Sequence, residues 1–391
     1  MDNLTGDHAV ARAERVTRIV RATSDATEAA CRLVPELLKA LHDERIFRVL
    51  LPSSLGGDEL DPVTLSCVTE AIAAEDASTG WCVGQAAGCA MTAAFLDPIP
   101  AHEIFGPDNS VLAWGAGAQG QAIKVDGGYR VTGKWPFASG SRHATWLGAH
   151  SCVCDADGTR QVRADGRPLN RTALFTRDKA AIVDNWQVVG LRGTGSDTYS
   201  VENLFVPDEH TIDRDDPAEL RTDGHVYRMS MVQVFAFAFA GVMIGIARGA
   251  LDDLSELAQK KTPRGAASSL LSSQMFHGQY GDLEARLRSA RAYVHVTGQQ
   301  YWDVVTAGGQ QTMELRAALR LAMTHAINQG VDVVTDAYRL AGQNAIFENA
   351  RFERRLRDAN AASQQVQARK THYATVGQTL LGLPPDSEMF I

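Results

Sequence analysis

The sequence has few cysteines, no excess of positive charge and no closely spaced histidines. Its six cysteines lie apart except for Cys152 and Cys154, whose thiols would point to opposite faces of a strand. This spacing is neither a zinc signature nor a CxxC redox pair, and the eleven histidines are scattered. The sequence therefore predicts no metal site and reduced thiols.

The charge balance argues against two classes of partner. A formal charge of −8 and a pI of about 5.8 disfavour general affinity for nucleic acid or an anionic membrane, because both need clustered positive charge. The N-terminal segment MDNLTGDHAVARAERV is charged and lacks the apolar core of a signal peptide. We expect a cytoplasmic protein with a small-molecule partner.

Long apolar runs are also scarce. Residues 229–247 are apolar apart from Ser230 and Gln233, which approaches the length of a membrane span. The run is rich in Ala, Gly, Phe and Met and stands between Arg228 and Arg248. We expect a helix buried in a bundle or oligomer rather than a membrane segment.

Motifs of several enzyme classes are missing too. The chain has no GxSxG elbow and no P-loop. Gly115, Gly117 and Gly120 form G-x-G-x-x-G, but no long helix follows them. A dinucleotide fingerprint needs a strand before it and a helix after it, so we interpret this match as accidental.

The spacing of apolar residues divides the chain into three parts. Intervals of three and four predict helices from about residue 11 to 105. Short runs punctuated by Gly, Asp and Pro predict a β-part between about 108 and 221, and the rest is helical in four long segments. We predict three domains, at residues 1–107, 108–222 and 223–391.

Turn residues indicate several element boundaries. Asp126-Gly127-Gly128 lies between two short strand-like runs and predicts a hairpin. Gly308-Gly309 and Ala341-Gly342 interrupt the C-terminal helices. Further strands are predicted at residues 145–153, 171–176, 181–189 and 198–206, with a polar loop at 155–168.

Two motifs of the β-part stand out. Residues 134–140 read KWPFASG, a strand segment with two aromatic side chains followed by a hydroxyl and a glycine. Residues 190–207 read GLRGTGSDTYSVENLFVP, a glycine-rich bend that leads into a strand ending at Pro207. Thr194 and Ser196 supply hydroxyl groups in the bend, which we interpret as a loop that faces a ligand.

These motifs and their order along the whole chain resemble the acyl-CoA dehydrogenase superfamily. Within it, the chain resembles the flavin-dependent hydroxylases that take reduced flavin from a separate reductase. The resemblance implies an α+β fold with an N-terminal helical domain, a central β-barrel-like domain and a C-terminal four-helix bundle. It also implies FMN or FAD as cofactor and an oligomer, expected to be a homotetramer.

The resemblance assigns cofactor contacts to the β-part. In the family, a segment similar to KWPFASG lies against the isoalloxazine ring, which needs an aromatic wall and hydrogen-bond donors at its edge. This implies that Phe137 packs on the ring, Ser139 hydrogen-bonds its edge and Trp135 forms a neighbouring wall. Gly140 and Thr194 are expected beside the cofactor as well.

Two helical segments resemble parts of the family that reach the flavin. Arg264 resembles an arginine that binds a flavin phosphate, often across a subunit boundary, as a guanidinium can do bidentately. A solvated arginine in a basic loop is the alternative. Residues 341–358, AGQNAIFENARFERRLRD, resemble a Gly-rich helix break followed by Arg-Asp, which implies that Gly342, Gln343 and Asn344 approach the flavin.

The chain departs from the family at the positions expected to move protons. Val366 stands where the dehydrogenases carry a proton-abstracting glutamate. The hydroxylases usually carry a histidine in a segment resembling RDxHxxxQH, whereas this chain reads RDANAASQQ, with Asn360 and Gln365. An amide donates hydrogen bonds but exchanges no proton near neutral pH. His143 and His372 are the alternatives for the missing base.

The resemblance therefore implies a monooxygenase that uses reduced flavin and O2, through a C4a-hydroperoxyflavin, to hydroxylate an aromatic or polycyclic small molecule. Ser139, Gln365 and Asn360 are the predicted catalytic contacts to the flavin and its oxygen adduct. Trp114 and Cys89, which stands near the place of another family histidine, are the predicted pocket walls. Two alternatives stay open: a dehydrogenase that holds FAD tightly and acts on an acyl thioester, and a member that binds flavin or a ligand without turnover.

Overall fold

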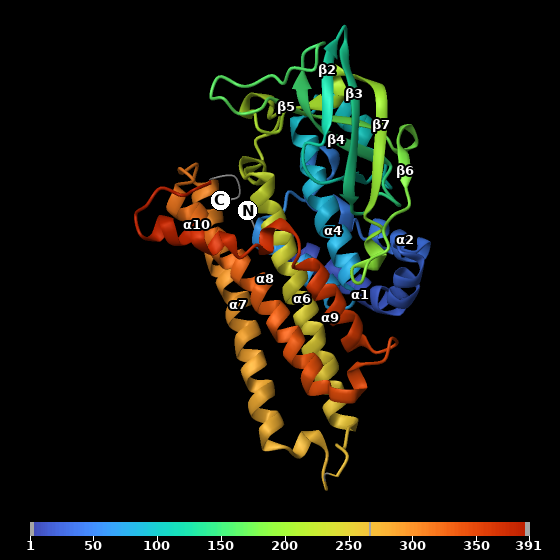
Figure 1. Ribbon diagram of the computed structural model, residues 1–391, viewed down its shortest axis with the longest axis vertical. Helices are drawn as coiled ribbons and strands as arrows, with labels where there is room; N and C mark the ends of the chain where they lie inside the picture. The colour runs from blue at the N-terminus through green and yellow to red at the C-terminus, as the bar shows by residue number, and fades with distance from the viewer. Residues whose placement is uncertain (1–3, 266, 388–391) are drawn as a thin grey trace.

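The computed structural model describes residues 4–265 and 267–387, with a strongly twisted sheet seated over one end of a set of long helices (Figure 1). The first part of the chain is helical, as predicted. Its helices are α1 (Leu4–Ala30), α2 (Pro35–Asp43), α3 (Pro62–Ala73), α4 (Ala77–Ala90) and α5 (Pro98–Phe105).

Helix α4 lies in the middle of the molecule because its sequence allows close approach on every side. Asp76 caps its first turn by accepting a hydrogen bond from the Thr79 backbone N–H at 2.8 Å. A Cβ at Gly80 would overlap α3, and one at Gly84 or Gly88 would crowd α6. The glycines thus let α4 carry side chains into the junction between the sheet and the helices.

The β-part forms one eight-stranded sheet in the order β6-β7-β3-β2-β4-β5-β8, with β1 paired to β4. The predicted hairpin is confirmed: β2 and β3 pair antiparallel from Gly120↔Gly133 to Val125↔Gly128. The strand predicted at 181–189 is confirmed only for its first three residues. The strands are β1 (Leu112–Trp114), β2 (Gly120–Val125), β3 (Gly128–Ala138), β4 (Trp146–Cys154), β5 (Asn170–Thr176), β6 (Ala181–Val183), β7 (Asp197–Pro207) and β8 (Thr211–Ile212).

The C-terminal part has three long helices and two short ones, rather than the four long segments predicted. The breaks at Gly308 and Gly342 are confirmed, and both residues take positive φ. The helices are α6 (Met231–Lys260), α7 (Gln274–Thr306), α8 (Met313–Ala341), α9 (Arg351–Ala362) and α10 (Thr371–Leu380).

Helix α6 is the core of the helical layer, which confirms the prediction of a buried helix. Among the described residues it is the one helix long and apolar enough to span a membrane, and 89% of its apolar window is buried inside the molecule. A capping box at Ser230 and Gln233 starts it. Helix α6 packs against α3, α4, α7, α8 and α9.

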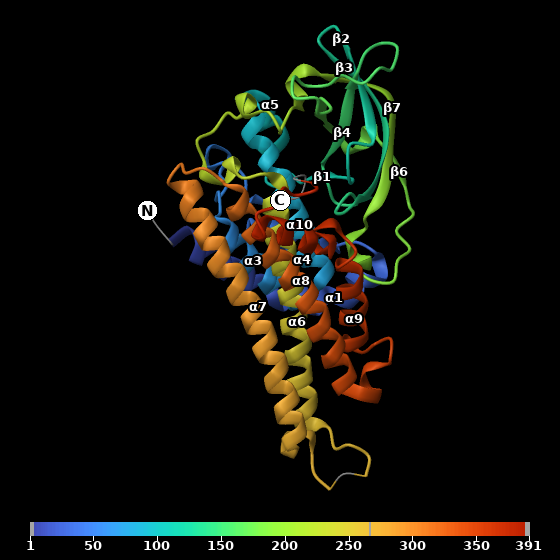
Figure 2. The same ribbon diagram turned by 60° about the vertical axis from the view of Figure 1, so that its left-hand side comes forward.

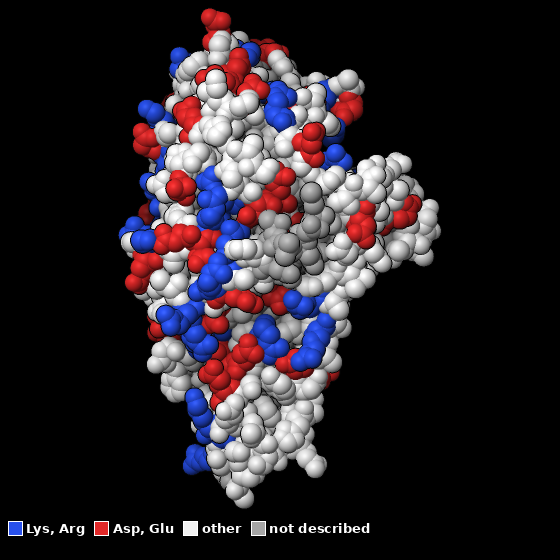
Figure 3. Space-filling view, turned by 180° about the vertical axis from the view of Figure 1, so that it is seen from behind, with Lys and Arg blue, Asp and Glu red and all other residues white. Residues whose placement is uncertain are grey.

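The molecule has two distinct ends (Figure 2). The sheet forms one end, and the connection between α6 and α7 lies at the opposite end. On the face seen in Figure 3, acidic and basic side chains are interspersed over the middle of the molecule.

Candidate active site

Strand β3 departs from regular pairing where the motif KWPFASG ends it. Pro136 has no backbone N–H, and the register with β7 shifts between Trp135 and Ala138. Phe137 takes a left-handed conformation with φ of 60°, and its side chain is 62% exposed. Its ring lies edge-on to Trp186, with 6.2 Å between ring centroids. The exposed ring of Phe137 is available to a planar ligand.

Trp135 points the other way, into the core of the β-part. It is fully buried and stacks on Tyr199 at 5.3 Å between centroids. Its indole Nε1 donates to the His150 carbonyl at 2.8 Å. The prediction that Trp135 walls the flavin ring is therefore wrong, because the bulge separates it from Phe137.

Ser139 begins a chain of buried hydroxyl groups just beyond the bulge. Its Oγ accepts a hydrogen bond from Trp81 Nε1 at 3.0 Å and lies 2.7 Å from Ser196 Oγ. Ser196 Oγ is in turn 2.7 Å from the hydroxyl of Thr194, which donates to the Leu191 carbonyl at 2.8 Å. These bonds hold the Ser139 hydroxyl at the boundary between β3 and α4.

The glycine-rich bend before β7 seats the sheet on the helices, which corrects its interpretation as a ligand-facing loop. A Cβ at Gly190 would overlap the backbone of α9. The Gly193 N–H donates to Ser78 Oγ at 3.1 Å, and the Leu191 N–H donates to Asp358 Oδ1 at 2.7 Å. The bend is thus fixed to α4 and α9 at once.

Thr194 and Gly140 lie in the same contact region between the sheet and the helices. Thr194 is 1% exposed and its carbonyl accepts from the Gly140 N–H at 2.9 Å. The φ of Gly140 is +80°, a left-handed conformation that glycine adopts without the steric cost that a side chain would bring. Both residues brace the loop that carries Ser139, which corrects the prediction that Thr194 contacts the cofactor directly.

Four aromatic side chains lead away from Ser139 along the junction of sheet and helices. Trp81 stacks on Phe239 at 4.0 Å between centroids, and Phe239 stacks on Phe235 at 5.7 Å. Phe235 meets Trp114 of β1 edge-on at 6.5 Å. We call Trp81, Phe239, Phe235 and Trp114 the aromatic row. It joins α4, α6 and β1 in an apolar surface that begins at the Ser139 hydroxyl.

Cys89 and Trp114 lie together, as their prediction as walls of one pocket requires. Cys89 is fully buried, and Gln85 Nε2 donates to its sulfur at 3.4 Å. Burial raises the pKa of the Cys89 thiol, and a backbone hydrogen bond from Trp114 offsets only part of this rise. The Cys89 thiol therefore stays protonated and is not a nucleophile.

Of the two predicted amides, Asn360 lies on α9 and Gln365 lies in the turn after it. Gln365 Oε1 accepts from the Gln367 N–H at 2.7 Å, while its Nε2 is buried without a partner. Asn360 is exposed on α9 and donates to a carbonyl of its own helix. Asn360 as a catalytic contact therefore stays a prediction, whereas Gln365 offers a buried donor without a partner.

The two histidines considered as substitute bases have other surroundings. His372 Nε2 lies 2.7 Å from the Val366 carbonyl, so it supports the turn that carries Gln365. Both ring nitrogens of His143 are buried without a partner, and burial lowers its pKa to about 3. Its ring lies 5.7 Å from Phe47, away from the aromatic row. His143 therefore stays neutral near pH 7.

The segment of Arg264, predicted to bind a flavin phosphate, and the segment 342–344, predicted to approach the flavin, lie at the other end of the molecule. Arg264 is exposed in the connection between α6 and α7, and Gly342, Gln343 and Asn344 are exposed after α8. Lys261 joins the two segments by donating to the carbonyl that precedes Gly342 at 2.6 Å. We call these residues the tip. Figures 1 and 2 place the α6–α7 connection far from the sheet, so one chain does not bring the tip to Ser139.

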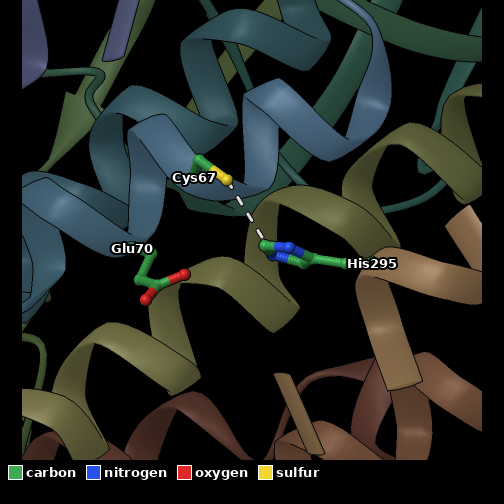
Figure 4. Close-up of side chains that lie close together, drawn as sticks. All are labelled: Cys67, Glu70 and His295. Atoms are coloured by element: carbon green, nitrogen blue, oxygen red, sulfur yellow. Dashed lines mark hydrogen bonds between the residues drawn. The ribbon is translucent and has the colours of Figure 1, made fainter. Parts of the chain in front are cut away.

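A separate cluster of ligand-type side chains lies between α3 and α7 (Figure 4). Cys67 Sγ is 3.8 Å from His295 Nε2, and Glu70 completes a trio whose ligand atoms lie within 4.8 Å. The sequence spacing did not reveal this cluster, because α7 is distant in the chain. Arg291 Nε donates to both Glu70 oxygens at 2.8 Å, so the carboxylate is already engaged.

Sequence reasoning missed most of the aromatic row. Phe235 and Phe239 are four residues apart in one apolar helix, a spacing that could have indicated a shared face. Trp81 carries no motif. Its contacts arise from the packing of α4 against α6 and the sheet, which no local pattern reports.

Comparisons with known proteins show the family of the chain. The model for the acyl-CoA dehydrogenase C-terminal domain matches residues 237–370. The indole-3-acetate monooxygenase of Pseudomonas putida is 30% identical over 355 residues, covering 90% of this chain and 87% of that protein. The chain belongs to the flavin-dependent monooxygenases that share the acyl-CoA dehydrogenase fold.

Solved structures place the fold in the same family. The HsaA monooxygenase of Mycobacterium tuberculosis superposes with a TM-score of 0.87 at 26% identity, covering 98% of this chain and 99% of that chain. HsaA is named as the oxygenase subunit of a flavin-dependent monooxygenase and is 28% identical over 95% of this chain and 94% of that protein. XiaF from Streptomyces, solved with FADH2, shares the fold with a TM-score of 0.88 at 22% identity, over 98% of this chain and 97% of that chain. The protein is a flavin-dependent oxidoreductase of this family.

Proposed function

We propose that this chain is the oxygenase component of a two-component system. It receives reduced FMN or FAD from a separate reductase and uses O2 to hydroxylate an aromatic or polycyclic small molecule. The observation that carries this proposal is the aromatic row, which is apolar, enclosed between sheet and helices, and ends at the Ser139 hydroxyl. Stacked aromatic faces of this kind suit a flat apolar ring and exclude water.

The residues at the sheet end fit a flavin ring. Phe137 offers an exposed aromatic face, Ser139 a fixed hydroxyl, and Gln365 a buried amide donor without a partner. An isoalloxazine has one flat face to cover and polar edges to hydrogen-bond, which matches this set. We propose that Phe137 packs on the ring, with Gly140 beside it, and that Ser139 and Gln365 bind its edge.

The flavin, when bound, supplies two electrons, so that one oxygen atom of O2 enters the substrate and the other leaves as water. The residues of the chain orient the bound molecules and keep water out of the site. Phe235 and Phe239 exclude water, and Trp81 fixes the direction of the Ser139 hydroxyl. Cys89 keeps its proton because burial raises its pKa. With Val366 at the position of the dehydrogenase glutamate, no carboxylate there removes a substrate proton.

We propose that a second copy of the chain completes the site as part of a homotetramer. The tip carries Arg264 and the exposed segment 342–344, whose donors suit a phosphate but lie far from Ser139 in one chain. Next to it, Ile346 is 62% exposed and Phe347 is 60% exposed, an apolar pair suited to a subunit contact. The tip of one chain would then hold the phosphate end of a flavin whose ring lies on the sheet of another.

This arrangement also gives a role to the three predicted domains. We propose that residues 1–107 and the barrel-like β-domain of 108–222 enclose the ring and substrate. The helical bundle of 223–391 would join the subunits. Helix α6 supports both tasks, because it packs on α3 and α4 at one end and leads to the tip at the other.

The test is transfer of ¹⁸O from ¹⁸O2 to product. Purified protein, a flavin reductase, FMN or FAD and a panel of phenols and indoles are incubated together, and products are read by mass spectrometry. We expect one ¹⁸O atom per product molecule. Ser139→Ala should release more hydrogen peroxide per turnover. Ser151→Ala should not, because among the described residues that buried hydroxyl bonds only within its own strand. Product without ¹⁸O, or no product from any compound, would contradict the proposal.

A further inference from the structure

Arg214 lies at the opposite end of the aromatic row from Ser139. It belongs to the connection between β8 and α6 and is partly buried. Its guanidinium carbon is 5.5 Å from the centroid of the Trp114 ring. Its Nη1 is 3.4 Å from His150 Nε2 and 3.3 Å from Met231 Sδ. The positive charge therefore borders the same apolar surface that leads to Ser139.

No carboxylate in the described chain lies within ion-pair distance of Arg214. Its neighbour in sequence, Asp213, is engaged by Arg163. Asp215 and Asp213 favour the charged guanidinium electrostatically, but neither forms an ion pair with it. The side chains in contact with Arg214 are an indole face, a thioether and His150, whose Nδ1 is 2.7 Å from Thr172 Oγ1. Burial lowers the pKa of His150, so this imidazole is neutral and does not repel the guanidinium.

A buried guanidinium without an anionic partner is unfavourable for folding, since arginine does not lose its proton in proteins. Charges in such positions are usually paired. Arg214 has five N–H donors, and only Nη1 has a hydrogen-bond contact in the described chain. Its remaining edge, Nε and Nη2, has the geometry to bind two carboxylate oxygens in parallel.

We propose that Arg214 binds the carboxylate of the substrate, which is therefore an aromatic acid. This inference rests on the proposed function, because it places the ring along the aromatic row and the reacting carbon toward Ser139. The carboxylate lies at the Trp114 end, where Arg214 fixes the ring's direction. The charge thus selects aromatic acids over neutral rings of the same shape.

The experiment measures equilibrium binding to the purified full-length protein, without turnover. The probes are matched pairs of acid and primary amide: benzoate with benzamide, phenylacetate with phenylacetamide, indole-3-acetate with indole-3-acetamide, and 2-naphthoate with 2-naphthamide. Each pair has the same shape and differs in charge. Binding is read by tryptophan fluorescence and calorimetry, in the presence of oxidised FMN or FAD.

We expect that in at least one pair the acid binds at least 10-fold more tightly than the amide. Arg214→Met keeps an apolar chain over Trp114 and should abolish this preference while leaving the amide affinity within 2-fold. The control is Arg221→Gln, in the same connection but exposed and paired with Asp97, which should keep the preference. In addition, the melting temperature of Arg214→Met without ligand should equal or exceed that of the wild type, whereas a purely structural arginine would lower it.

The inference is overturned if no acid is preferred in any pair, including the case in which none of the probes binds. It is also overturned if Arg214→Met keeps the preference, or changes the oligomeric state instead because the charge pairs with a second copy. Failure of the proposed function looks different: the acid preference and its loss in Arg214→Met would remain, but ¹⁸O transfer would be absent.

Discussion

Asp358 provides a quantitative test of how the bend before β7 is held. Its carboxyl group is 3% exposed and accepts the Leu191 N–H at 2.7 Å. Burial raises its pKa to about 7, with Asp76 and Glu28 adding to the rise and Arg357 opposing it. In the unfolded chain the pKa returns to about 4. A difference of about 3 units corresponds to about 4 kcal/mol of folding free energy.

Whether the free energy of unfolding rises or falls with pH depends on which state, folded or unfolded, holds the proton. Between about pH 4 and pH 7 the folded protein keeps the proton that the unfolded chain has released. The free energy of unfolding therefore falls as the pH rises through this window and reaches its full loss above about pH 7. Asp358→Asn keeps an oxygen for the Leu191 N–H but cannot ionise. It should stabilise the protein relative to the wild type at high pH.

The assay is denaturant unfolding of both proteins at about pH 5.5 and about pH 8. The stability advantage of Asp358→Asn should grow by about 2 kcal/mol between these conditions. The control is Asp178→Asn, an exposed aspartate, for which the difference should stay within about 0.5 kcal/mol at both values. A pH-independent difference between Asp358→Asn and the wild type would refute the reasoning.

Three further predictions concern the residues around Ser139. Gly190→Ala should destabilise the protein by about 1–3 kcal/mol in denaturant unfolding, because its Cβ would overlap the backbone of α9; an unchanged midpoint would contradict the seating of the bend. Trp81→Phe keeps the stack on Phe239 but removes the donor to Ser139. The free energy of unfolding should therefore fall by about 1 kcal/mol. A larger fall would indicate that Trp81 acts mainly through packing. Cys89 should resist N-ethylmaleimide at about pH 8 in folded protein while half-buried Cys31 reacts, and labelling of Cys89 as fast as Cys31 by mass spectrometry would contradict its burial.

The sequence predicted the order of helices, sheet and helices because that order depends on local patterns. Apolar spacing and Gly or Asp turns mark element boundaries directly, as at Gly127, Gly308 and Gly342. Cys89 and Trp114 lie close together, and their role as pocket walls stays a prediction. The family motif also led to Ser139, whose hydroxyl lies where β3 meets α4.

The errors have physical causes that a local pattern does not contain. Trp135 and Phe137 are two residues apart and would share a face of a regular strand, but the bulge between them turns one inward and the other outward. The glycine-rich bend was interpreted as facing a ligand, whereas its Gly190 and Gly193 make room for α9 and Ser78. Arg214 reaches the aromatic row from a connection without a motif, so only its spatial neighbours reveal it.

The central claim, that the chain controls the reaction of reduced flavin with oxygen, is tested most directly by rapid mixing. Protein is mixed anaerobically with reduced FMN or reduced FAD and then with oxygenated buffer, while the flavin spectrum is followed. The account predicts that with one of the two flavins a transient species absorbs differently from reduced and oxidised flavin and outlives its counterpart in free solution. Reoxidation of both flavins at the rate seen without protein would contradict it.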